Sequence, residues 1–83
     1  MHTIYKYVLG STYTSVPAGD ILRVEEQNGI PCAWVLHDLD IYLNESMTLQ
    51  IFATGEQFDL QDLKHVGTTV GPDFVFHVFK RLN

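Results

Sequence analysis

The side chains best suited to acid–base chemistry are the histidines at positions 2, 37, 65 and 77. An imidazole acts as a general base when its pKa lies near the working pH and a partner orients it. Nothing in the local sequence orients any of the four, and His77, between apolar neighbours, is typical of a packed strand residue. Ser11, Ser15 and Ser46 have no base nearby and lie in no nucleophile motif. We therefore predict that the protein is not an enzyme.

His37, Asp38 and Asp40 offer the nitrogen and oxygen ligands that divalent metals use. In an extended strand, however, the His37 side chain points away from both aspartates. The Cys and His spacings of zinc sites are also absent. The alternative is a polar strand end that leads into an acidic loop, and we favour it. We expect no metal and no other cofactor.

The cationic side chains could instead hold a small anion. Ten acidic and five basic residues give a net charge of −5, which argues against a long DNA or RNA partner. A small pocket needs only a few cations and donors. Its cations must come from Lys6, Arg23, Lys64, Lys80 and Arg81.

Two polar turns add donors that could hold a phosphate: one at Thr54-Gly55, the other at Gly67 to Thr69. The alternative is that both are simply turns. His65, beside Lys64 and after a polar loop, is the histidine best placed to touch a ligand.

Aromatic side chains could stack on a planar ligand, as they do on other β surfaces. Tyr5, Tyr7 and Trp34 are the candidates. We favour a core position for Trp34, because Cys32 and Leu36 share its face, and leave the tyrosines open. The candidate ligand-binding set is Tyr5, Arg23, Trp34, Thr54, Gly55, Lys64 and His65.

The elements that must position these residues are strands. Asn28-Gly29 between two apolar alternating runs predicts a type I′ turn, and therefore an antiparallel hairpin. Period-2 alternation predicts strands over 4–9, 20–27, 30–37, 47–54, 65–70 and 74–79. Residues 13–16 could add a short extended piece, 59–63 could form one helical turn, and 38–46 is left unassigned. The expected fold is all-β, a small antiparallel β-sandwich or partly open barrel of about six strands.

Length and composition indicate one domain over residues 1–83. The apolar share of 46% and aromatic share of 12% are enough for a packed core. Open sheets leave strand edges to be paired, so we expect a homo-oligomer. The single Cys32 is expected to be a small buried residue in a reducing compartment. No apolar run approaches the roughly 18 residues of a membrane span, so no membrane partner is expected.

Several segments together carry a family pattern: Ile4 to Tyr7, Ile21 to Val24, Gln27 to Trp34, Thr54-Gly55, Val66 to Thr68 and Phe74 to Phe79. In these segments the chain resembles a family of short bacteriophage proteins, recorded mainly as a domain of unknown function. The similarity covers most of the chain, with a gap between Asp38 and Ser46. The resemblance implies a small protein made in the cytoplasm of an infected host.

Small all-β phage proteins of this size include counter-defence "sponges" that bind cyclic nucleotide signals of host immunity. By this analogy the expected function is non-enzymatic binding of a small anionic nucleotide. Such binding needs stacking aromatics and a few cations, and no catalytic residue. The alternative is a protein-interaction module that inhibits or redirects a host protein through a strand edge or an apolar patch.

Overall fold

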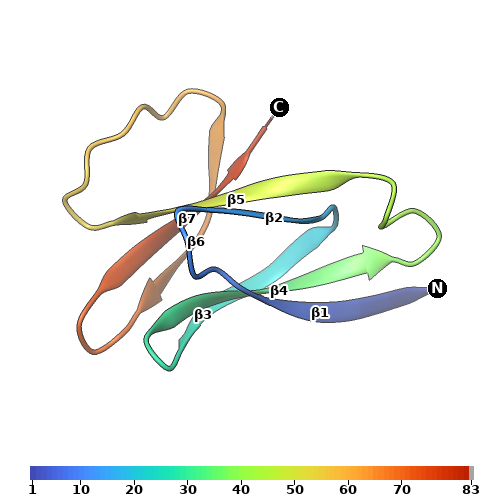
Figure 1. Cartoon of the computed structure of the whole chain (residues 1–83), viewed down its shortest axis with the longest axis horizontal. Helices are drawn as coiled ribbons and strands as arrows, with labels where there is room; N and C mark the ends of the chain where they lie inside the picture. The colour runs from blue at the N-terminus through green and yellow to red at the C-terminus, as the bar shows by residue number, and fades with distance from the viewer. Residues whose placement is uncertain (83) are drawn as a thin grey trace.

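The computed structural model describes residues 1–82 and places seven strands in two antiparallel sheets (Figure 1). The strands are β1 (His2–Val8), β2 (Tyr13–Pro17), β3 (Asp20–Gln27), β4 (Ile30–Asp38), β5 (Ser46–Ala53), β6 (Leu63–Val70) and β7 (Val75–Arg81). Sheet A has the order β1-β4-β3, and sheet B has the order β2-β5-β7-β6. The expected sandwich is confirmed, whereas the barrel alternative is wrong because the sheets do not close on each other.

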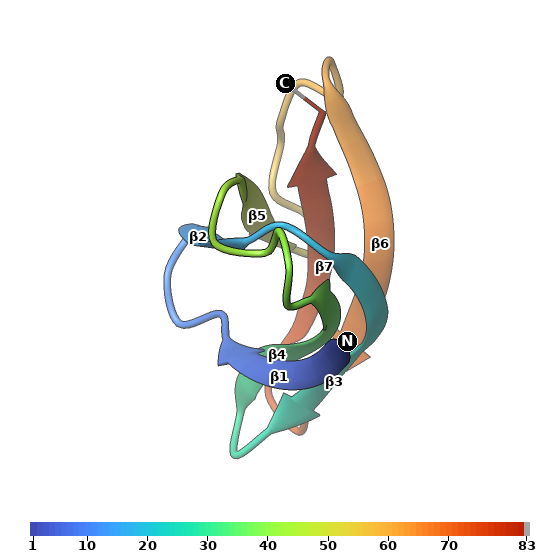
Figure 2. The same cartoon turned by 90° about the vertical axis from the view of Figure 1, so that its right-hand side faces the viewer.

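The two sheets form separate layers, and Figure 2 shows sheet A at the bottom, with β6 and β7 of sheet B rising above it. The strand beyond the expected six is β2, where only a short extended piece was foreseen. Residues 1–82 contain no helix that is long and apolar enough to cross a membrane.

The Asn28-Gly29 hairpin forms as predicted. Asn28 has φ 55° and Gly29 has φ 83°, the two positive values that a type I′ turn requires. Gln27 pairs with Ile30 across the turn, which leaves a loop of two residues. This turn fixes the register of β4 against β3 and therefore decides which β4 side chains share a face.

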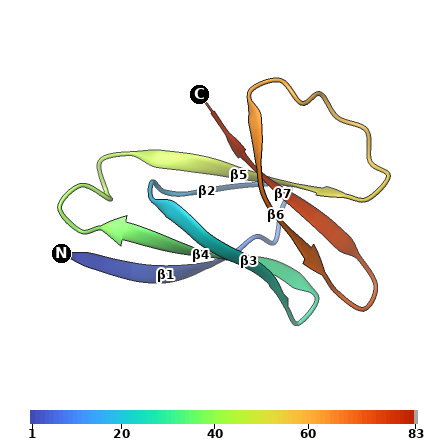
Figure 3. The same ribbon diagram turned by 180° about the vertical axis from the view of Figure 1, so that it is seen from behind.

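The core lies between the sheets and is built from small and medium apolar side chains. Ala33 and Val35 of β4 face Leu49 of β5 and Val78 of β7, and all four are essentially inaccessible to water. At one side β3 packs against β6, as Figure 3 shows from behind. There a Cβ on Gly67 would overlap the Val24 side chain.

Trp34 does not lie in the core, so the preference for a core position was wrong. It is half-buried on the outer face of sheet A, because its neighbours Ala33 and Val35 are the residues that face sheet B. Cys32 shares the Trp34 face yet is buried and free, with its thiol 3.7 Å from the Ile30 carbonyl oxygen. The cysteine is therefore buried as expected, but outside the space between the sheets.

The helical turn expected at 59–63 is also wrong, because a β-turn occupies its place. The Leu63 amide donates to the Leu60 carbonyl at 3.1 Å, and the Gln61 amide donates to an Asp59 carboxylate oxygen at 3.0 Å. Asp62 has φ 60°, which a right-handed helix does not allow. A five-residue segment closes too few helical hydrogen bonds to outweigh such local alternatives.

Segment 38–46, left unassigned from sequence, is a loop with one inward anchor. The amides of Ile41 and Tyr42 both donate to the Asp38 carbonyl, at 3.1 and 2.9 Å. This tight turn directs the half-buried Tyr42 ring onto His37, with ring centroids 5.2 Å apart. The loop therefore closes the end of the sandwich at which β4 finishes.

We predict that Gly67→Ala destabilises the fold by about 1–3 kcal/mol, because the added methyl overpacks the contact with Val24. Urea unfolding followed by circular dichroism measures the change. Gly10→Ala is the matched control, since nothing lies near its Cβ position. An unchanged midpoint for Gly67→Ala would mean that the sheets do not meet closely at this point.

Candidate functional site

The residues of the sequence-derived ligand set do not converge on one site. Arg23 and Trp34 are direct partners across β3 and β4. The remaining five lie elsewhere: Tyr5 on the inner face of β1, Lys64 on the inner face of β6, His65 on the outer face of β6, and Thr54 and Gly55 in the turn after β5. Of these, Thr54 and His65 are linked only indirectly, through Thr68 and His77. Each surface must therefore be assessed separately.

The outer face of sheet A carries an aromatic residue between two cations. Trp34 pairs with Lys6 of β1 on one side and with Arg23 of β3 on the other. Residues paired directly across antiparallel strands project from the same face of the sheet. Lys6 is one of the five cations of the sequence, but it is not in the predicted ligand set, because only the strand order places it beside Trp34.

Both cations of this row are held by weak, exposed contacts. The Lys6 ammonium donates to Gln27 Oε1 at 2.8 Å, and Arg23 Nε lies 3.0 Å from Glu25 Oε2. The side chains of Arg23 and Glu25 are 68% and 52% exposed, so their ion pair is worth no more than about 1 kcal/mol. A ligand anion can replace either partner at low cost.

The Lys6 contact links the two edge strands of sheet A. Lys6 lies on β1 and Gln27 on β3, with β4 between them. Their hydrogen bond therefore spans the outer face of β4.

An apolar rim surrounds the row of Lys6, Trp34 and Arg23. Ile4, Val8 and Leu22 are 54%, 52% and 53% exposed. Exposure of this size shows that no other segment of residues 1–82 covers these side chains. We call this surface, made of Ile4, Lys6, Val8, Leu22, Arg23 and Trp34, the Trp34 face.

The outer face of sheet B is closed by its own loop. Phe58 in the loop after β5 stacks on Phe52, with ring centroids 3.8 Å apart and planes 12° apart, and meets Phe79 edge-on at 5.2 Å. Phe52 and Phe79 are buried beneath it. The loop, which projects at the upper left of Figure 1, is therefore anchored to the sheet by an aromatic cluster.

A chain of hydrogen bonds uses the polar groups of this face. The Thr54 hydroxyl lies 2.8 Å from His77 Nε2, His77 Nδ1 lies 3.1 Å from the Thr68 hydroxyl, and that hydroxyl lies 3.0 Å from His65 Nε2. Two predicted ligand residues, Thr54 and His65, are thus connected through Thr68 and His77. The chain ties the start of the loop to β6.

The Thr54-Gly55 turn has little left to offer a phosphate. The Thr54 amide donates to the Val75 carbonyl at 3.2 Å, and the Glu56 amide donates to the Ala53 carbonyl at 3.1 Å. Gly55 has φ 93°, a value that glycine adopts without strain. The pair serves the turn, which is the alternative stated for it above.

His37 is the one fully buried histidine of the described chain, with 0% exposure. Its Nδ1 lies 2.9 Å from the Ala18 carbonyl oxygen, which can only accept, so Nδ1 carries the proton. In the neutral ring Nε2 then accepts from the Tyr7 hydroxyl at 2.8 Å. The Tyr7 hydroxyl, the His37 ring and the Ala18 carbonyl are thus arranged like a nucleophile, its base and an orienting acceptor. The His37 ring, however, is fully buried.

The environment of Tyr7 keeps its hydroxyl protonated. Burial raises the pKa of Tyr7 above its usual value of 10.0, and the nearby Tyr42 and Tyr5 raise it further. A phenol with a raised pKa remains a hydrogen-bond donor and is a poor nucleophile. Tyr5, whose ring centroid lies 6.0 Å from that of His37, belongs to the same cluster as Tyr7 and His37.

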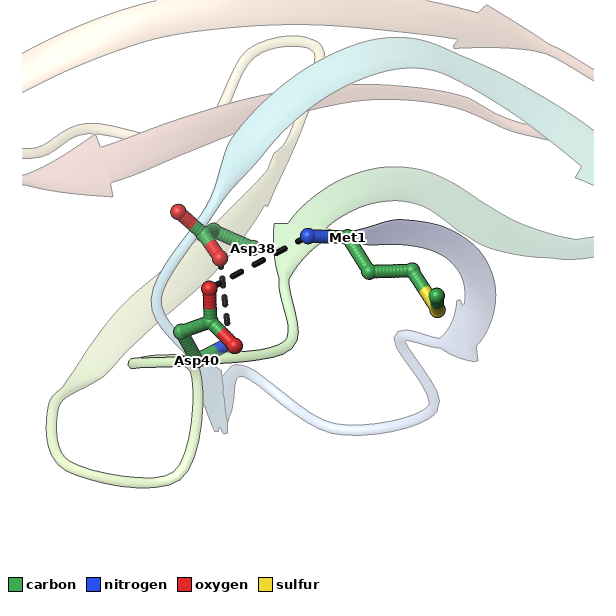
Figure 4. Close-up of polar contacts among 3 residues, drawn as sticks. All are labelled: Met1, Asp38 and Asp40. Carbon is green, nitrogen blue, oxygen red and sulfur yellow. Dashed lines mark hydrogen bonds and ion pairs between the residues drawn. The ribbon is translucent and has the colours of Figure 1, made fainter.

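The metal-ligand types at the end of β4 do not come together. Both His37 nitrogens are engaged, and Figure 4 shows Asp38 in contact with Asp40, and Asp40 with the Met1 amino group. The Asp40 amide donates to Asp38 Oδ1 at 3.0 Å, and Asp40 Oδ2 lies 3.9 Å from the Met1 amino group. Within residues 1–82, no three side chains of metal-binding type form a cluster.

The fold and its surfaces define a small all-β sandwich domain with one open, aromatic and cationic face. A family model described as "Domain of unknown function (DUF7352)" matches residues 1–83, and the chain belongs to that family. No curated protein and no solved structure matches significantly. The resemblance to an uncharacterised domain family is confirmed, and the family brings no activity to transfer.

We predict that Tyr7→Phe destabilises the protein by about 1–3 kcal/mol at pH 7, because it leaves the buried His37 Nε2 without a donor. The wild-type protein should also lose stability above pH 10. There the unfolded chain releases the Tyr7 proton before the folded one does, so the unfolded state binds fewer protons and unfolding becomes easier.

Urea unfolding between pH 7 and 11.5 measures both effects, and Tyr7→Phe should reduce the loss of stability above pH 10. Tyr13→Phe, at an exposed tyrosine on sheet B, is the control and should leave both unchanged. Equal alkaline profiles for wild type and Tyr7→Phe would contradict the raised pKa.

Proposed function

We propose that this protein is a non-enzymatic binding protein that holds a small anionic nucleotide on the Trp34 face. The observation that carries the proposal is the cross-strand row in which Trp34 stands between Lys6 and Arg23. An indole offers a surface on which any base can stack, worth about 1–3 kcal/mol per base. Cations beside it meet the phosphates, and an arginine can do so with two parallel hydrogen bonds.

The charge of the chain limits the ligand to a small one. With a net charge of −5, the protein repels a long polyanion. A ligand with one to three phosphates needs only the local positive charge of Lys6 and Arg23, whose present partners exchange readily.

The single tryptophan favours a homo-oligomer around the ligand. A cyclic dinucleotide presents two bases related by a twofold axis. Two copies of the Trp34 face around the same axis would stack one base each and would bury the rim of Ile4, Val8 and Leu22. The biological setting we propose is the cytoplasm of a phage-infected bacterium, where such a protein would withdraw an immune signal. This setting rests on the sequence resemblance and not on the fold.

We predict that a cyclic dinucleotide quenches the fluorescence of Trp34 and raises the oligomer mass measured by sedimentation. Trp34→Leu should weaken binding roughly 5- to 150-fold by calorimetry, since stacking contributes about 1–3 kcal/mol. Trp34→Phe should recover part of the affinity, and Arg23→Gln should weaken it without unfolding the exposed site.

Tyr13→Leu removes an exposed aromatic from the other sheet and is the matched control. If a panel of cyclic di- and trinucleotides neither quenches Trp34 nor raises Tm at concentrations far above micromolar, the proposal fails. A ligand that binds only the folded state must stabilise it.

A second candidate function, binding of a host protein, is favoured by the free edge of β1. Strand β1 is the outer strand of sheet A and carries the exposed Ile4 and Val8. A strand edge that is free on one side and carries apolar side chains can pair with a strand of another protein or contact its apolar surface.

We predict for this alternative that the wild-type chain retains one host protein in stoichiometric amount from bacterial lysate. Ile4→Lys should lose that partner, because a lysine on an edge strand opposes pairing and disrupts the apolar rim. The fold should survive, since Ile4 is largely exposed. Retention of the same partner by Ile4→Lys would place the contact elsewhere.

A further inference from the structure

Two lysines stand directly opposite each other in sheet B. Lys64 of β6 pairs with Lys80 of β7, and Lys80 pairs in turn with the core residue Leu49. The register therefore directs both lysines to the inner face of the sheet, toward sheet A. Like charges in direct cross-strand pairs repel and destabilise the sheet.

Neither ammonium group is neutralised within the fold. In the part of the chain that the structure describes, no carboxylate lies within 4.0 Å of either ammonium nitrogen, and neither makes a hydrogen bond. The chain has ten acidic side chains for five basic ones, so acids are not scarce. Two of its five cations are nevertheless placed together and left unpaired.

A cavity of about 290 Å³ lies at this pair, between the start of β3, the start of β6 and the end of β7. Its lining residues are Gly19, Asp20, Ile21, Lys64, Val66, Lys80 and Leu82. Ile21 and Val66 also pack against the core, so part of the wall is apolar. Asp20 is the one carboxylate in this lining and forms no ion pair with either lysine.

A second hollow of about 360 Å³ shares Lys80 and Leu82 with the first. Its wall also contains Arg81 and one carboxylate, Glu45. Lys80 therefore borders both hollows.

We propose that the Lys64 and Lys80 pair binds a compact anion of the phosphate class, either inorganic phosphate or a phosphate monoester. A doubly charged oxyanion between the two ammonium groups removes their mutual repulsion and gains charge-assisted hydrogen bonds from both. This site is independent of the proposed nucleotide site, because the Trp34 face lies on the opposite side of sheet A.

The test measures the Tm of the whole chain against inorganic phosphate and, separately, glycerol 3-phosphate, at constant ionic strength set with sodium chloride. Each wild-type titration should give a Tm rise that saturates, as expected for a ligand that binds the folded state. The tighter of the two identifies the source of the phosphate group.

Lys64→Met and Lys80→Met should each abolish most of this rise. In the absence of ligand each should be at least as stable as the wild type, because one repelling charge is gone. Lys6→Met, which removes a lysine from the Trp34 face, is the matched control and should keep the full rise.

Amide chemical shifts in ¹⁵N NMR spectra of the wild type give a readout that needs no variant. Phosphate should move the amides around Ile21, Lys64 and Lys80 and leave those around Trp34 unchanged. The proposal is overturned if chloride alone gives the same Tm rise, if both lysine variants keep it, or if the shifts appear elsewhere. Trp34→Leu should keep the phosphate effect, so failure of one site is distinguishable from failure of the other.

Discussion

The close approach of the two sheets along the inner face of β4 is the constraint on which the other features depend. At its centre this face carries the small side chains of Ala33 and Val35, which belong to the same buried cluster as Leu49 and Val78. Gly67 allows a similarly close approach where β6 passes Val24. Because β4 alternates, placing Ala33 and Val35 inward forces Trp34 outward. The open aromatic face is therefore a consequence of how tightly the other face is packed.

Local signals in the sequence predicted the strands well, because each signal acts within a few residues. Asn28-Gly29 specified its turn through backbone angles alone, and alternation placed β1, β3, β4 and β5. Alternation could not decide which face of β4 points inward, since one face carries Trp34 and the other Val35, and both are apolar. That decision belongs to the opposing sheet, which is distant in sequence. The helical turn predicted at 59–63 was wrong for a local reason. The segment is too short for helical hydrogen bonds to outcompete a β-turn.

The site was harder to predict than the fold because it depends on strand order. Composition indicated that any anion site must use the five cations, but it could not pair them. Lys6 reaches Trp34 only because β1 lies beside β4, and Lys80 meets Lys64 only because β7 lies beside β6. Thr54 and His65 were predicted as ligand contacts because of their polar groups. In the structure these groups form hydrogen bonds with His77 and Thr68. Polar residues near a turn are thus ambiguous until their partners are known.

The polar groups of the protein differ in the free energy needed to free them from their internal contacts for ligand binding. Displacing the Tyr7 hydroxyl from His37 leaves a buried acceptor unpaired, at about 1–3 kcal/mol. Releasing Arg23 from the exposed Glu25 costs at most about 1 kcal/mol. Among residues 1–82, the ammonium groups of Lys64 and Lys80 have no hydrogen-bond or ion-pair partner to lose. Stacking of one base stabilises a complex by about 1–3 kcal/mol. This gain exceeds the cost of releasing Arg23, but it is no larger than the cost of displacing the Tyr7 hydroxyl. These costs favour the two proposed sites, the Trp34 face and the lysine pair, over the buried histidine.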